Sequence, residues 1–180
     1  HIDHGKSTLA LALCLGGARL VTDDTLVLTP GAPVSCRPGI QAVRLRGEAA
    51  THLAPSMDTE RDWTIRGDRV VTALDASSVI SSPVPLRAMY LLSPEEPDPA
   101  RPLVSRRRLD MLTAGMSLVG NLKLGRLLEH EGALLGPALA VAGAVPTWTL
   151  HLQRDLSRLD EAVRAILAWG YDGSPSPGGE

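Results

Sequence analysis

The sequence predicts an α/β sandwich in which a mixed β-sheet is flanked by helices. Two observations lead to this class: short β-prone runs alternate with helical segments, and a strongly amphipathic helix follows the last predicted strand. The length of 180 residues suits one compact domain over 1–170. The stretch 171–180 is rich in Gly, Pro and Ser, so we expect a disordered tail there.

The predicted elements follow one another along the chain. A leucine-rich helix over 6–15 should end at the glycines 16 and 17. We then expect short strands over 19–22, 25–29, 42–45 and 69–74, a buried strand over 86–92, an exposed acidic loop over 94–102, two helices between 105 and 135, a strand over 146–152 and a helix over 155–169.

The last of these helices has the clearest pattern. Asp155 can cap its N-terminus, and Gly170 can end it. Its apolar residues recur at helical spacing on one face, namely Leu156, Leu159, Val163, Ile166 and Leu167.

The composition of the chain argues against two classes of partner, nucleic acids and membranes. A formal net charge of -2, with three Trp, two Tyr and no Phe, gives no case for a nucleic-acid partner. No apolar run approaches the ~20 residues that span a bilayer, so we expect no membrane partner. Cys14 and Cys36 have no metal-ligand spacing and are expected to be reduced thiols, which suits a cytoplasmic protein.

The chain opens on a phosphate-binding motif. Residues 1–7, His-Ile-Asp-His-Gly-Lys-Ser, match the last seven positions of G-x-x-x-x-G-K-[ST], and Thr8 follows. Backbone N–H groups at Gly5, Lys6, Ser7 and Thr8 would cradle the phosphates of ATP or GTP. Lys6 would add a point charge to the phosphoryl oxygens, and the Ser7 hydroxyl would bind Mg²⁺. The motif therefore predicts a P-loop-containing sandwich, with a strand expected upstream of His1.

The wording of this loop is also similar to that of translational GTPases. That class needs a D-x-x-G element and an N-K-x-D element. No Asp of this chain has Gly three residues later, and the nearest approach to the second element, Asn121-Leu-Lys-Leu, lacks both the adjacent Lys and the Asp. The GTPase interpretation fails on both counts.

Two adjacent aspartates, Asp23 and Asp24, follow the predicted strand over 19–22. A kinase needs carboxylates at this place: one can hold or orient Mg²⁺, and another can accept the proton of an attacking hydroxyl. The alternative is a turn aspartate that caps the next element. Adjacent residues of a strand point to opposite faces, so both can face one ligand only where the strand ends.

The segment 17–28, Gly-Ala-Arg-Leu-Val-Thr-Asp-Asp-Thr-Leu-Val-Leu, resembles the stretch after the phosphate-binding loop in HPr kinase/phosphorylase and its shorter relatives. The resemblance is strongest over residues 1–28. It implies that Asp23 is the catalytic base, acting with Lys6, and that Asp24 joins Ser7 at the metal.

Three departures indicate a shortened relative of that family. Asp3 stands where the family usually has glycine, the family's catalytic histidine belongs to a strand before the loop, and its glycine-rich downstream segment is not found here. His1 and His4 lie within the loop and are not equated with the catalytic histidine.

Other motifs have more ordinary interpretations. We expect the arginines 106–108 on a solvated helix face, and Arg61, Asp62 and Arg66 in an exposed loop. Cys14 and the three tryptophans are expected to pack in the interior, and His52, His130 and His151 show no metal spacing.

These observations predict a cytoplasmic, Mg²⁺-dependent kinase that transfers the γ-phosphoryl group of ATP or GTP to a serine hydroxyl of a protein or peptide. Two alternatives stay open: a P-loop nucleotide hydrolase of another class, and a nucleotide-binding regulatory module without turnover. Phosphorylase activity, the acceptor's identity and assembly into a homo-oligomer are open as well.

Overall fold

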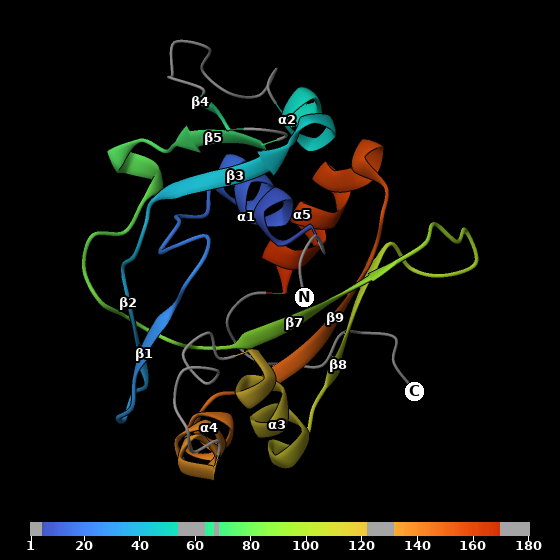
Figure 1. The fold of residues 1–180 in the computed structure, drawn as a ribbon. Helices are drawn as coiled ribbons and strands as arrows, with labels where there is room; N and C mark the ends of the chain where they lie inside the picture. The colour runs from blue at the N-terminus through green and yellow to red at the C-terminus, as the bar shows by residue number, and fades with distance from the viewer. Residues whose placement is uncertain (1–4, 54–63, 67–68, 122–131, 170–180) are drawn as a thin grey trace.

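A computed structural model describes residues 5–53, 64–66, 69–121 and 132–169. Within them the chain forms a mixed α/β fold with three small sheets (Figure 1). The helices are α1 (Lys6–Leu15), α2 (Gly47–Leu53), α3 (Met111–Asn121), α4 (Gly132–Ala144) and α5 (Leu159–Ala168), with short 3₁₀ turns at Ala76–Ser78 and Leu156–Arg158.

Each sheet has three strands in the described residues. The first has the order β1 (Val27–Thr29), β2 (Ser35–Arg37), β6 (Val84–Pro85), and the second β3 (Ala42–Arg46), β5 (Arg69–Ala73), β4 (Thr64–Arg66); both are antiparallel. The third has the order β7 (Met89–Glu95), β9 (Thr147–Gln153), β8 (Val104–Arg108). In it β7 runs parallel to β9 and β8 runs antiparallel, so the predicted mixed sheet is present, but as one of three sheets.

The main core lies between the second and third sheets. Figure 1 shows α1 and α5 between these sheets, with α3 and α4 beyond the third one. The core cluster joins Leu11 of α1, Leu45 of β3, Leu150 of β9 and Val163 of α5. Leu11 and Leu45 are 0% and 1% exposed, and each such burial contributes about 1.5–3 kcal/mol to folding. These contacts fix α1 against the sheets and thereby place its N-terminus.

The first helix and the last strand follow the sequence prediction closely. α1 spans 6–15 as predicted, and the backbone turns at the two glycines that follow it. β9 lies within one residue of the predicted strand, while the predicted helix over 155–169 begins with the 3₁₀ turn that Asp155 caps. The predicted strands over 42–45 and 69–74 are β3 and β5.

Several predicted strands are shorter or displaced. The strand over 19–22 is reduced to a single bridge between Leu20 and Val79, and the strand over 25–29 begins only at Val27. The strand over 86–92 was wrong in place and burial: β7 begins at Met89, extends to Glu95 and is half-buried to exposed. Its position at one end of its sheet explains this, because an end strand has one side unpaired and tolerates a proline such as Pro94.

The prediction of two helices between 105 and 135 was also partly wrong. Its first residues form β8, the helix α3 follows, and residues 122–131 lie outside the described part of the chain. The helix α2 was not predicted. The predicted loop at Arg66 includes the strand β4, whereas Arg61, Asp62 and the tail 171–180 lie outside the described residues.

The arginines at 106–108 therefore belong to a strand and not to a helix face. The Arg106 guanidinium lies 4.7 Å from the Trp148 ring centre and 4.8 Å from that of Trp169, and it donates to the Tyr90 hydroxyl at 3.0 Å. Tyr90 and Trp169 also stack, with ring centres 6.3 Å apart. This half-buried cation over two aromatic faces connects Trp169, at the end of α5, to the third sheet.

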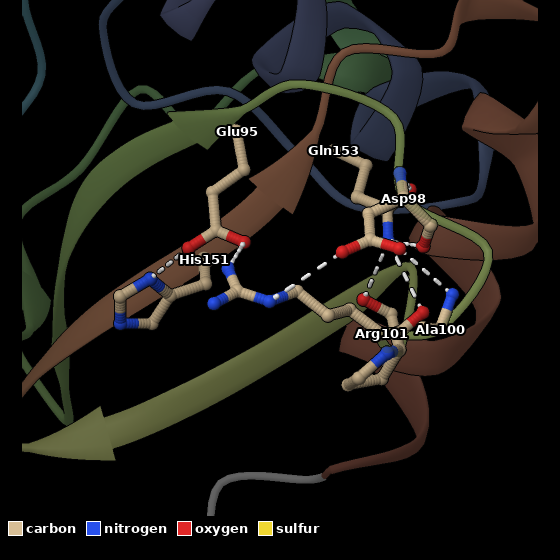
Figure 2. Close-up of polar contacts among 7 residues, drawn as sticks. Glu95, Asp98, Ala100, Arg101, His151 and Gln153 are labelled. Carbon is tan, nitrogen blue, oxygen red and sulfur yellow. Dashed lines mark hydrogen bonds and ion pairs between the residues drawn. The ribbon is translucent and has the colours of Figure 1, made fainter.

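A buried glutamine anchors the loop between β7 and β8 (Figure 2). Gln153 is 5% exposed; its Oε1 accepts the N–H of Asp98 at 2.9 Å, and its Nε2 donates to the carbonyls of Asp98, Arg101 and Pro102 at 2.9, 3.1 and 3.1 Å. Beside it, Glu95 accepts from Arg101 at 3.3 Å and lies 2.7 Å from Nδ1 of His151. The Gln153 side chain thus holds the loop over 94–102, which was predicted only to be exposed.

We expect Gln153→Ala to lower the free energy of unfolding by about 1–3 kcal/mol, because several backbone groups of the loop lose their partner. Urea unfolding followed by circular dichroism measures the change. Thr51→Ala is the matched control, since the Thr51 side chain is exposed and its hydroxyl donates to the Gly47 carbonyl of its own helix α2, and its effect should stay within about 0.5 kcal/mol. Equal losses in the two variants would contradict the anchoring role.

Two capping carboxylates predict a loss of stability in acid. Hydrogen bonds from Thr113 lower the pKa of Asp110 from its ordinary 3.8, and those from Ser157 do the same for Asp155. A carboxylate whose pKa is lower in the folded state than in the unfolded state stabilises the fold at pH values above the unfolded pKa. This stabilisation is lost as the pH falls through the folded-state pKa. We therefore expect stability to decline below about pH 4. The double variant D110N/D155N, whose amides cap without titrating, should decline less steeply in urea titrations.

Candidate functional site

The first turn of α1 presents the residues of the predicted phosphate-binding motif. Gly5 precedes the helix in a left-handed conformation, with φ 76° and ψ 13°, which glycine adopts without strain. Its carbonyl accepts the N–H of Leu9 at 2.9 Å. No side chain among the described residues caps this end, and the first turn contains no acidic residue. Because first-turn N–H groups have no partner within a helix, this end suits an anion.

The side chains of this turn divide between solvent and core. Lys6 is exposed, Ser7 and Thr8 are half-buried, and Leu9 is buried. The burial of Leu9 and Leu11 fixes the rotation of the helix, so that Lys6 lies on the outer side. Residues 1–4 of the motif, including His1, Asp3 and His4, lie outside the described part of the chain.

Asp23 lies directly beside this turn. The Ser7 hydroxyl donates to its Oδ2 at 3.0 Å, and the backbone N–H of Arg44 donates to the same oxygen at 3.2 Å. The other carboxylate oxygen, Oδ1, is buried and has no hydrogen-bond partner among the described residues. A buried carboxylate oxygen without a donor is unfavourable unless a ligand completes it.

Asp24 points elsewhere. It is exposed, and its Oδ2 lies 3.8 Å from the guanidinium of Arg44. A surface pair of this kind contributes about 0–1 kcal/mol. The structure thus brings Ser7 and Asp23 together, and it places the neighbouring Asp24 beside the Arg44 guanidinium.

The oxygens of Ser7 and Asp23 suit a magnesium ion. Mg²⁺ prefers hard oxygen ligands, and at nucleotide sites it uses one or two carboxylates together with phosphate oxygens and water. The orphaned Oδ1 of Asp23 offers such an oxygen next to the Ser7 hydroxyl. Among the described residues no three His, Cys, Asp or Glu side chains form a metal-binding group.

Two residues near the site were not found by sequence reasoning. Arg44 contributes its backbone to Asp23 and its side chain to Asp24, although it belongs to no motif. Gly39 passes close to the segment before Asp23: a Cβ there would lie 2.7 Å from Thr22 Oγ1, and its N–H donates to Val21 O at 3.1 Å. Both contacts join segments that are distant in the sequence, and the local sequence contains no pattern for them.

Other residues considered for chemistry serve packing. Cys14 is half-buried against the main core, and burial raises the pKa of its thiol, which disfavours a nucleophile. Trp148 is buried, and Trp169 packs against the core cluster. No helix in the described ranges is long and apolar enough to cross a bilayer.

Comparison of the chain with models of known protein families, with curated proteins and with solved structures finds no match. Functional inference therefore depends on the geometry of the α1 turn and of the Asp23 carboxylate.

We expect Asp23→Ala to lower the free energy of unfolding by about 1–3 kcal/mol, because the Ser7 hydroxyl and the Arg44 N–H lose a charged acceptor. Asp24→Ala is the matched control and should cost less than about 1 kcal/mol. Urea unfolding of the two variants at pH 7 compares them. A larger loss for Asp24→Ala would show that the observed contacts do not hold the site.

Proposed function

We propose that this chain is a Mg²⁺-dependent kinase domain that transfers the γ-phosphoryl group of ATP or GTP to a serine hydroxyl of a protein or peptide. The observation that supports it best is the hydrogen bond between Ser7 and Asp23 at the N-terminus of α1. P-loop enzymes use this pair, a loop Ser or Thr and a nearby Asp, to hold Mg²⁺. The resemblance of residues 1–28 to HPr kinases adds the reaction class.

The binding roles follow from the contacts. The N–H groups of the first α1 turn and the exposed Lys6 would hold the β- and γ-phosphates, and Ser7 with Asp23 would hold the metal. When bound, Mg²⁺ would neutralise phosphate charge during the transfer. Arg44 would orient the metal-binding pair of Ser7 and Asp23, since its backbone N–H donates to the Asp23 carboxylate.

The contacts favour exchanging the two roles that the family resemblance implies. Asp23 contacts Ser7 at the expected metal position, whereas Asp24 lies on the exposed side beside Arg44, where an incoming hydroxyl could approach it. In the proposed step, the serine oxygen forms a bond to the γ-phosphorus as the bond to the β-phosphate oxygen breaks. The serine proton passes to the Asp24 carboxylate, and the nucleoside diphosphate leaves.

The proposal is tested by transfer of ³²P from γ-labelled ATP or GTP, with Mg²⁺, to HPr and to serine-containing peptides. We expect label on serine, and a kcat about 10²- to 10⁴-fold lower for Asp24→Asn, the variant that lacks the proposed base. Asp160→Asn, an exposed acidic residue of α5, is the matched control and should transfer normally.

Two variants separate the roles of the aspartates. In titrations with a fluorescent nucleotide, Asp23→Asn should raise the Mg²⁺ concentration needed for half-maximal binding by about 10- to 100-fold. Asp24→Asn should bind the nucleotide normally and show a lower kcat. The reverse result would restore the assignment implied by the family. Release of phosphate without labelled acceptor would indicate a hydrolase, and nucleotide binding without turnover would indicate a regulatory module.

A further inference from the structure

A small pocket lies between the first sheet and the end of α4. Its volume is about 310 Å³, which is at the lower end of the ~300–1,000 Å³ range of small-molecule sites. Its lining comes from three segments: the turn between β1 and β2, the connection between β6 and β7, and the C-terminal end of α4. Figure 1 shows this turn and α4 together at the lower left of the molecule. A ligand of this pocket would therefore be small.

The buried part of the lining is apolar and fixed by the fold. Val34 and Val145 are 4% and 2% exposed and belong to one core cluster, against which Leu86 packs. The N–H of Leu86 donates to the carbonyl of Val34 at 2.8 Å, which joins two of the three segments. The N–H of Val145 donates to the carbonyl of Val141 at 2.9 Å, which holds the end of α4. The pocket is therefore formed before any ligand arrives, and binding needs little rearrangement.

Arg87 is the charged residue among the described residues that line the pocket. Its side chain is exposed, and no hydrogen bond or ion pair joins it to another residue in the described ranges. A guanidinium carries a positive charge and presents its N–H donors in a planar fork that matches the two oxygens of a carboxylate. The pocket thus combines a cation that is free to bind a ligand with an apolar surface.

We propose that this pocket binds a small carboxylate whose apolar part is compact, such as a short aliphatic chain or a single ring. Its charge would meet Arg87, and its apolar part would lie against Val34, Leu86 and Val145. The C-terminal end of α4 carries partial negative charge, so the carboxylate belongs on the side of Arg87 and not at Ala144.

The chemistry of the lining favours a carboxylate over a phosphate. A phosphate brings more charge and more acceptor oxygens than one guanidinium satisfies, and the other described residues of the lining include no second cation. Its unpaired oxygens would face apolar side chains, which is unfavourable. The pocket shares no residue with the α1 turn or with Asp23 and Asp24, so this inference goes beyond the proposed kinase function and is tested without it.

The test titrates the chain with 4-fluorobenzoate at pH 7 and follows the ligand by ¹⁹F NMR. We expect saturable binding with a Kd of about 1 mM, which is the affinity that a ligand of this size supplies. The uncharged 4-fluorobenzamide should bind about three- to tenfold more weakly, because it lacks the charge-assisted hydrogen bonds to the guanidinium. In ¹⁵N NMR spectra the backbone amides of Val34, Leu86 and Val145 should shift most, which locates the ligand in the pocket.

Two pairs of variants separate the charge of the pocket from its shape. Arg87→Gln should raise the Kd for 4-fluorobenzoate about three- to tenfold and leave that for 4-fluorobenzamide unchanged. Arg164→Gln, an exposed arginine of α5, is its matched control and should change neither Kd. Ala144→Leu should fill the pocket and raise both Kd values by about tenfold or more. Its control is Ala140→Leu, which is exposed one turn earlier on α4 and outside the lining.

Several results would refute the carboxylate pocket. One is binding that does not saturate, another is equal affinity for the acid and the amide, and a third is an effect of Arg164→Gln or Ala140→Leu as large as that of its partner variant. Equal displacement of the probe by inorganic phosphate would replace the apolar acid by a simple anion. Tighter binding of a short peptide that ends in leucine would assign the pocket to the C-terminus of a partner protein. Circular dichroism and urea unfolding of each variant separate loss of binding from loss of fold.

Discussion

The Asp23 carboxylate joins three parts of the chain that are distant in sequence. Its Oδ2 accepts from Ser7 at the start of α1 and from the backbone of Arg44 in β3, while the carboxylate itself belongs to the segment that follows α1. The helix is fixed independently by Leu11 in the core. Because the helix position and the strand position are both set by packing, the carboxylate lies beside the Ser7 hydroxyl, and its Oδ1 is buried without a hydrogen-bond partner among the described residues.

The local part of this site was predictable, and its long-range part was not. The bounds of α1 follow from a leucine-rich stretch that ends in two glycines, and the motif at Gly5 to Thr8 is read from consecutive residues. Asp23 was selected from its position after a predicted strand, and its role stays a prediction. The different contacts of Asp23 and Asp24 were not predictable, because they depend on Arg44, whose approach is set by the pairing of β3. No local pattern encodes that pairing.

The same limit explains the errors in the fold. A charged run such as 106–108 was interpreted as a solvated helix face, yet Arg106 lies between Trp148 and Trp169 on a strand. A charged residue is predicted to face solvent because burying an isolated charge costs free energy. Here aromatic faces and the Tyr90 hydroxyl from three other elements lower that cost, and these partners become visible only when the third sheet and α5 are assembled. Similarly, β7 is apolar but half-buried because it ends its sheet.

Arg44 shows how one residue can position a side chain through its backbone alone. Its backbone N–H donates to Asp23, and any residue other than proline would supply that donor. Its side chain is therefore not required for the position of Asp23, and its guanidinium lies on the exposed side, 3.8 Å from Asp24. The strand β3 thus uses its inward side chains, Val43 and Leu45, for the core and its backbone for the Asp23 carboxylate. The side chain at position 44 can then change without displacing Asp23.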